Sequence, residues 1–222
     1  MSIDPAQILF EGIAFLFAIS VHESAHAWTA NRCGDPTASM LGRITLNPIK
    51  HIDVIGTIVV PAIAMYYGGF LIGWAKPTPV DPRHFRNPVR DDILTSLAGP
   101  VSNLLVATVS TLALIVISLF SPTAHALVLG AQLETDSVWV PLVFFFKMMM
   151  YINVLLAVFN VIPVPPLDGS HVLRHFLPES ARRMYDTVGM FGLLLLFLWG
   201  GRFIEAMMVP FLHFFDAILR FG

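Results

Sequence analysis

The residues best suited to chemistry form a short motif near the N-terminus, His22-Glu23-Ser24-Ala25-His26. On an α-helix, His22 and His26 lie one turn apart on the same face, so both imidazoles can bind one zinc ion. Glu23 is then placed to take a proton from a water molecule on that ion and to deliver it later to a leaving amine. The spacing is typical of a metalloprotease site, although helices that bind no metal also contain it.

The composition places this motif in an apolar setting. Of the 222 residues, 56% are hydrophobic and only 13% are charged, and the mean hydropathy is +0.73. These values predict a polytopic membrane protein and exclude an ordinary soluble domain. The formal net charge of -2 leaves no basic surface for nucleic acid, and the single cysteine, Cys33, excludes an intrachain disulfide. No cleavable signal peptide is expected, because the first apolar run carries the motif itself.

We expect an all-α membrane protein with four to six membrane segments in a single domain, residues 1–222. Core spans are predicted at residues 7–30, 93–119 and 138–164, and C-terminal helices at 187–221, of which 203–221 either crosses the membrane or lies on its surface. Residues 52–74 are apolar but interrupted by Pro61 and Gly68-Gly69, which favours a re-entrant segment over a straight span. Short strands are expected between Leu41 and Val80.

The charges that flank the apolar segments predict the orientation. Basic residues on both sides of residues 52–74 and after residue 168 belong on the cytoplasmic side by the positive-inside rule, whereas residues 121–137 contain no lysine or arginine. His22 then lies roughly 12 Å below the cytoplasmic surface, inside the bilayer. Two histidines and a carboxylate at that depth need a functional or pairing reason.

A zinc site with two histidines lacks a third protein ligand, and a carboxylate is a known third ligand beside paired histidines. Asp168 is our candidate. It follows Pro163-Val164-Pro165-Pro166, which ends the preceding span on the same side of the membrane, and Gly169 allows a sharp turn. The alternative is that Asp168 caps the helix that follows.

The remaining histidines are weaker candidates. His171 and His175 share the spacing of the first pair but have no glutamate between them, so a cytoplasmic amphipathic helix is the simpler interpretation. No partner at ligand spacing accompanies the others, which we expect to have no functional role: His51, His84, His125 and His213.

Asparagines are the other polar candidates in the spans. Asn103 lies at about the depth of His22, where its amide either donates to an oxyanion or makes an interhelical contact. Asn153 and Asn160 are seven residues apart and share a helical face that should point into the protein. The proline-rich residues 73–80 are expected to be extended, either holding a substrate by strand addition or forming a stiff loop.

Three motifs together resemble the site-2 protease family of intramembrane zinc metalloproteases: His22-Glu23-x-x-His26, Gly99-Pro100-x-x-Asn103, and Asn160-x-x-Pro163 leading into Leu167-Asp168-Gly169. The resemblance implies zinc bound by His22, His26 and Asp168, Glu23 as the general base, and Asn103 and Asn160 supporting the site. It implies hydrolysis of a peptide bond within a transmembrane helix of a membrane protein substrate. Residues 73–80 also resemble the compact bacterial members, which suggests a bacterial plasma membrane. Unlike the larger members, this chain has no room for a PDZ domain.

The alternative function is a membrane metal transporter or sensor that uses His22, Glu23, His26 and Asp168 as a transit site. It predicts exchangeable metal and further ligands leading across the bilayer, and the sequence shows no such series of ligands. A metallohydrolase acting on soluble substrates is a third possibility, which the burial of the motif disfavours.

Overall fold

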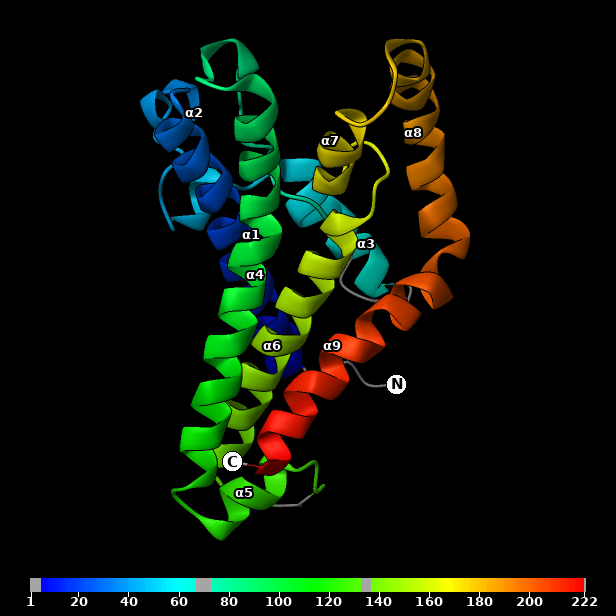
Figure 1. Cartoon of the computed structure of the whole chain (residues 1–222). Coiled ribbons are helices and arrows are strands. Elements are labelled where there is room, and N and C mark those ends of the chain that lie inside the picture. Colours follow the sequence, from blue (N-terminus) through cyan, green and yellow to red (C-terminus); the bar gives the residue numbers. More distant parts are fainter. Residues whose placement is uncertain (1–4, 67–72, 133–136, 222) are drawn as a thin grey trace.

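The protein is built from helices. The structure, a computed structural model, describes residues 5–66, 73–132 and 137–221. Within these ranges no residue belongs to a β-strand, so the short strands expected between Leu41 and Val80 are not found in the part described. The helices, shown in Figure 1, are α1 (Pro5–Cys33), α2 (Thr37–Met40), α3 (Val60–Tyr66), α4 (Pro88–Ser118), α5 (Pro122–Val128), α6 (Trp139–Val161), α7 (Asp168–Arg174), α8 (Glu179–Trp199) and α9 (Gly201–Phe221), with the short 3₁₀-helices η1 (Pro48–Lys50) and η3 (Pro82–His84) and the π-helix η2 (Val54–Val59).

Three of the described helices are long and apolar enough to cross a membrane: Ile8–Cys33 of α1, Pro88–Ser118 and Trp139–Val161. They confirm the three predicted core spans. α4 begins earlier than expected because its N-terminus is capped: the Asn87 side chain accepts a hydrogen bond from the Arg90 N–H, and the Asp91 carboxylate accepts one from the Asn87 N–H at 2.8 Å. Such reciprocal bonds satisfy donors that a helix start leaves free.

The three spanning helices pack into one bundle, in which α4 and α6 run side by side (Figure 1). One apolar cluster joins α1 to α6 through Ala14, Phe15, Ala18 and Ile19 on α1 and Met149 and Ile152 on α6. The alanines let the two helices approach closely, as small residues do at helix contacts in lipid. A second cluster joins α4, α5, α6 and α9, with Leu114 and Val154 fully buried at its centre.

The apolar segment 52–74 contains η2 and α3. Its apolar helix, Val54–Ile63, is shorter than the ~20 residues that a membrane span needs, and residues 67–72 lie outside the described part. The Trp74 N–H donates to the Gly56 carbonyl at 3.0 Å, and the Thr57 hydroxyl donates to the Trp74 carbonyl at 2.8 Å. The beginning and the end of this segment therefore lie side by side.

The proline-rich turn after α6 places α7 against α6 and α4. α6 ends at Val161, because Ile162 is extended (φ -60, ψ 128), as expected for a residue that precedes a proline. Gly169 lies so close to the end of α6 that an added Cβ would be 2.5 Å from the Val161 carbonyl carbon. Its φ is not positive, so the glycine is needed for this close approach and not for the sharp turn that we expected.

The C-terminal helices expected at 187–221 are present, but α8 begins at Glu179 because the polar residues before the apolar run continue the helix. Arg174 of α7 binds Asp186 of α8 at 3.1 Å. α9 packs on the bundle with Met208, Phe215 and Leu219. Neither helix is among the described ones that are long and apolar enough to span a membrane.

Asp92 of α4 holds the C-terminal end of α7 through His171 and through His175, the residue directly after the helix. His175 Nε2 donates to Asp92 Oδ2 at 2.7 Å, and His171 Nδ1 lies 3.6 Å from Asp92 Oδ1. The interaction with this carboxylate raises the pKa of His171, because the negative charge stabilises the imidazolium. The second histidine pair thus joins α7, the helix that carries Asp168, to α4.

We expect Asp92→Asn to lower the pKa of His171 toward its ordinary value of 6.5. A raised pKa means that the ion pair stabilises the folded protein below that ordinary value and that this stabilisation is lost as the pH rises through the raised pKa. NMR titration of histidine-labelled protein measures the shift. Asp186→Asn, which removes a carboxylate bound to Arg174 instead, is the control; equal pKa values for His171 in the two variants would contradict the assignment.

Candidate metal centre

Helix α1 places His22 and His26 together, as their spacing predicts. Their Nε2 atoms are 3.0 Å apart, and their exposed fractions are only 7% and 8%. Since α1 is one of the spanning helices, the two imidazoles lie within the bundle and not on a loop.

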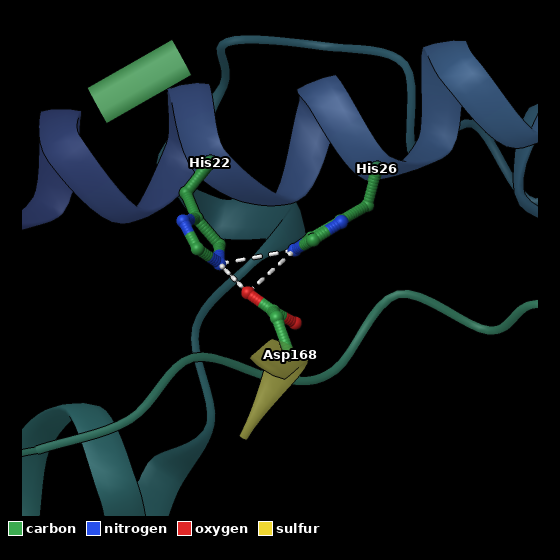
Figure 2. A group of neighbouring side chains, drawn as sticks. All are labelled: His22, His26 and Asp168. Carbon is green, nitrogen blue, oxygen red and sulfur yellow. Dashed lines mark hydrogen bonds and ion pairs between the residues drawn. The ribbon is translucent and has the colours of Figure 1, made fainter. Parts of the chain in front are cut away.

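Asp168, the first residue of α7, completes the cluster (Figure 2). Its Oδ2 lies 3.2 Å from His22 Nε2 and 3.4 Å from His26 Nε2. The three ligand atoms lie within 4.8 Å of one another, and no other group of three or more His, Cys, Asp or Glu side chains in the described residues meets this criterion. The structure thus brings together the three residues that we predicted as metal ligands.

Hydrogen bonds on the far side of each ring determine which nitrogen carries the proton. His26 Nδ1 lies 2.7 Å from the Thr95 carbonyl, which only accepts, so this nitrogen must donate. His22 Nδ1 lies 2.6 Å from Asn103 Oδ1 and likewise donates. When the imidazoles are neutral, as metal binding requires, this tautomer leaves both Nε2 atoms as acceptors that face Asp168.

The orientation of Asn103 follows from a chain of amides that ends on a backbone carbonyl. Asn153 Nδ2 donates to the Met149 carbonyl at 2.8 Å, which turns Asn153 Oδ1 toward Asn103. Asn103 Nδ2 donates to that oxygen at 2.7 Å, so Oδ1 of Asn103 faces His22. Asn103 and Asn153 are both fully buried. Asn153 of α6 thus determines that Asn103 presents its oxygen, and not its NH₂ group, to the His22 ring on α1.

One face of α4 fits around the two rings. Thr95, Gly99 and Asn103 follow one another at intervals of four residues, so they share that face. Thr95 and Asn103 bind the two rings, and Gly99 lies between them. A Cβ at Gly99 would lie 2.6 Å from His22 Nε2 and would also overlap His26. Glycine is therefore required where the helix passes the imidazoles.

The geometry of the cluster fits a divalent cation. Two bare imidazole nitrogens and a carboxylate oxygen face one another, and Asp168 Oδ2 is buried without a hydrogen-bond donor among the described residues. Three acceptors at such distances repel one another unless a cation lies between them. Two nitrogens and one oxygen are a ligand set of catalytic zinc sites, in which a fourth position stays open for water or substrate.

Glu23 points to a different partner from its two histidine neighbours. Its Oε2 accepts a hydrogen bond from the Thr78 N–H at 2.7 Å, and its backbone carbonyl accepts one from the Thr78 hydroxyl at 3.0 Å. Thr78 belongs to residues 73–80, which have no regular secondary structure and contact the motif at this point; their extended conformation stays a prediction. Glu23 also interacts electrostatically with His26.

Asn160 is not joined to the cluster by the described contacts. Its Nδ2 donates to the Leu156 carbonyl of its own helix at 2.9 Å, and its supporting role stays a prediction. His171 and His175 are also separate from the cluster, since both bind Asp92.

The sequence did not indicate the roles of Thr95 and Thr78. For Asn153 it predicted only that the side chain points into the protein, and not that it binds Asn103. Thr95 and Thr78 act through the backbone, which leaves no signal in residue type. The face shared by Thr95, Gly99 and Asn103 could have been found from their spacing alone.

Comparison with known proteins supports the chemistry of the cluster. The model of the family described as Peptidase family M50 matches residues 10–199. The chain is 36% identical over 180 residues to "Putative zinc metalloprotease YwhC" of Bacillus subtilis (strain 168), which covers 81% of this chain and 74% of that protein. It is 30% identical over 171 residues to "Putative zinc metalloprotease Rip2" of Mycolicibacterium smegmatis (strain ATCC 700084 / mc(2)155), covering 77% of this chain but 58% of that protein.

The chain thus spans about three quarters of the first relative and less than two thirds of the second. No solved structure matches significantly. The family match extends over most of the chain and includes all three residues of the cluster. The chain therefore belongs to peptidase family M50, the site-2 protease family.

Proposed function

We propose that this zinc metalloendopeptidase hydrolyses a peptide bond within a transmembrane helix of a membrane protein substrate, and that His22, His26 and Asp168 hold the zinc. The observation that carries the proposal is the convergence of three acceptor atoms inside a bundle of membrane-spanning helices. Membership of a peptidase family and the zinc metalloprotease names of the relatives support the chemistry.

Each residue of the motif has a distinct task. Zinc, when bound, acts as a Lewis acid that polarises the peptide carbonyl and makes water acidic enough to lose a proton near neutral pH. Glu23 accepts that proton and delivers it to the leaving amine, so the base must be ionised at the start and protonated in between. Asn103 and Thr95 keep the Nδ1 protons of the histidines in place, which leaves both Nε2 lone pairs for the metal.

The arrangement of charges supports an active site toward the cytoplasm. Figure 1 shows α2, α7 and the starts of α4 and α8 at one end of the molecule, with α5 at the opposite end. The C-terminal end of α1 leads into α2 and lies at the same end. That end carries most of the basic residues, Arg32, Arg43, Lys50, Lys76, Arg83, Arg86, Arg90, Arg174, Arg182 and Arg183. By the positive-inside rule it faces the cytoplasm, and the bacterial relatives favour a bacterial plasma membrane.

Segment 52–74 fits a re-entrant loop in this orientation. Its two ends are joined by hydrogen bonds, as a segment that returns to the side it left requires. Irregular backbone at membrane depth is tolerated where it lines a cavity, and zinc chemistry needs water. We propose that the segment is re-entrant and that water reaches the cluster from the cytoplasmic side.

The buried position of the site defines the substrate class. A peptide bond in a transmembrane helix is shielded by its own hydrogen bonds, so the substrate helix must unwind before its carbonyl can be attacked. Helices weakened by glycine or proline should therefore be cleaved best. A metal transporter would need further metal-binding sites across the membrane. The described residues contain one candidate cluster, which favours the protease over the transporter.

The test uses the protein reconstituted in liposomes with a single-span fusion protein whose apolar helix carries a central Asn-Pro pair. A matched fusion with a helix of only leucine and alanine is the control. We expect zinc-dependent cleavage at a site inside the first helix, located by mass spectrometry, and slower cleavage of the second. Cleavage confined to residues outside both spans, or none in either, would overturn the intramembrane assignment.

We expect Glu23→Gln to keep its zinc and to lose cleavage by a factor of about 10² or more, because glutamine cannot accept the proton. Elemental analysis and the liposome assay measure the two properties on the same preparation. Full proteolysis by purified Glu23→Gln would rule out the mechanism.

We expect Gly99→Ala to lower zinc affinity by about 10–100-fold, because its methyl group would displace both imidazoles. A Cβ at Gly12, also in a spanning helix, would meet nothing within 4 Å, so Gly12→Ala is the matched control. Competition with a chromogenic chelator measures the affinity. Equal affinities in the two variants would contradict the close approach of α4 to the rings.

A further inference from the structure

Arg43, in the turn after α2, is a cation buried to an exposed fraction of 5%. Among the described residues it makes no ion pair within 4.0 Å, and its guanidinium binds backbone carbonyls instead. Nη1 donates to Lys50 O, and Nη2 donates to Lys76 O and to Pro77 O, the last at 3.0 Å. Burying a charge without an ion pair costs free energy. We therefore expect Arg43 to have a function besides joining the two loops.

His51, to which we assigned no role from the sequence, belongs to the same network. It is fully buried; its Nε2 donates to Thr45 O at 2.8 Å, and its carbonyl accepts from Lys76 N at 2.8 Å. Thr45 is bound in turn to Ser24 of α1, whose hydroxyl accepts from the Thr45 N–H at 3.1 Å. The loop that carries Arg43 and His51 is therefore fastened to α1 at the residue next to Glu23.

The network ends on the Glu23 carboxylate. Thr78 lies between Pro77 and Pro79, which have no N–H, so its amide is the single backbone donor of these three residues. That amide donates to Glu23 Oε2 at 2.7 Å. Arg43 binds the carbonyl of Pro77, directly before this amide, and interacts electrostatically with Glu23.

We infer that Arg43 and Thr78 are positioning residues for Glu23: Arg43 holds the backbone at Lys76 and Pro77, and the Thr78 N–H holds the carboxylate of the base beside the zinc ligands. The inference rests on the proposed role of Glu23 as proton acceptor. A glutamate side chain has several rotamers, and a charge-assisted hydrogen bond to a held backbone amide selects one of them. No described residue donates to Oε1, which leaves that oxygen to accept the proton from water.

The contact itself is tested without substrate, by NMR hydrogen exchange of the Thr78 amide in threonine-labelled protein. We expect exchange to be faster by about tenfold or more in Glu23→Ala and in Arg43→Gln than in the wild type. Arg83→Gln is the matched control, because Arg83 is exposed and, among the described residues, its side chain binds Asp81 alone. Unchanged exchange of Thr78 in Arg43→Gln would overturn the role of Arg43.

The consequence for the reaction is tested with two variants of Thr78. Thr78→Val keeps the N–H and the branched shape, whereas Thr78→Pro removes the N–H; both variants lose the hydroxyl, so they differ in the amide. We expect Thr78→Pro to keep zinc and KM but to lower kcat by about tenfold or more, and Thr78→Val to retain most of kcat. Equal losses in both variants, or full activity of Thr78→Pro, would overturn the role of the amide.

The two tests separate this inference from the proposed function. If the wild type cleaves no membrane helix while Thr78 exchange responds to Glu23→Ala and Arg43→Gln as expected, the proposed function fails and the contact stands. If the wild type cleaves but Thr78→Pro retains kcat, the proposed function stands and the positioning role fails.

Discussion

The structure depends on two imidazole nitrogens and one carboxylate oxygen that converge on a single point. His22 Nε2, His26 Nε2 and Asp168 Oδ2 approach to 3.0–3.4 Å in a site shielded from water. Such an arrangement fits a divalent cation, and on the proposed function zinc would hold the cluster together as well as take part in the reaction. The bonds from His22 and His26 to α4 matter for the same reason, because they keep the protons on the opposite side of each ring.

Each spanning helix makes a different contribution to this constraint. α1 supplies the two rings, and α4 supplies the acceptors and the glycine that leaves room for them. α6 orients Asn103 through Asn153 and, beyond its last turn, carries the proline-rich connection that brings Asp168 to the rings. α7 is held in turn by Asp92 of α4. The site is therefore assembled by tertiary packing, and no two of these helices suffice to form it.

Much of this site could be predicted from the sequence, and the rest could not, for physical reasons. We could predict His22, His26 and Asp168 as a group, because metal ligands are recognised by residue type and spacing. Thr95 binds the His26 ring through its backbone carbonyl, and Thr78 binds the Glu23 carboxylate through its backbone N–H, so neither contact depends on residue type. No other histidine or carboxylate lies at metal-ligand spacing from His51 in the sequence. Its contacts with Thr45 and Lys76, which join two loops, are seen only in the folded structure. The strands expected between Leu41 and Val80 were inferred from turn residues, and in the described part those turns separate short helices instead.

The most direct test of the account is the zinc content of the detergent-purified protein, measured by elemental analysis for wild type, Asp168→Ala and the control Asp186→Ala. A cluster held by two histidines and one carboxylate predicts about one zinc per chain in the wild type and the control, and loss of most of it in Asp168→Ala. Unchanged zinc in Asp168→Ala would contradict the account, because the turn after α6 would then not supply the third ligand.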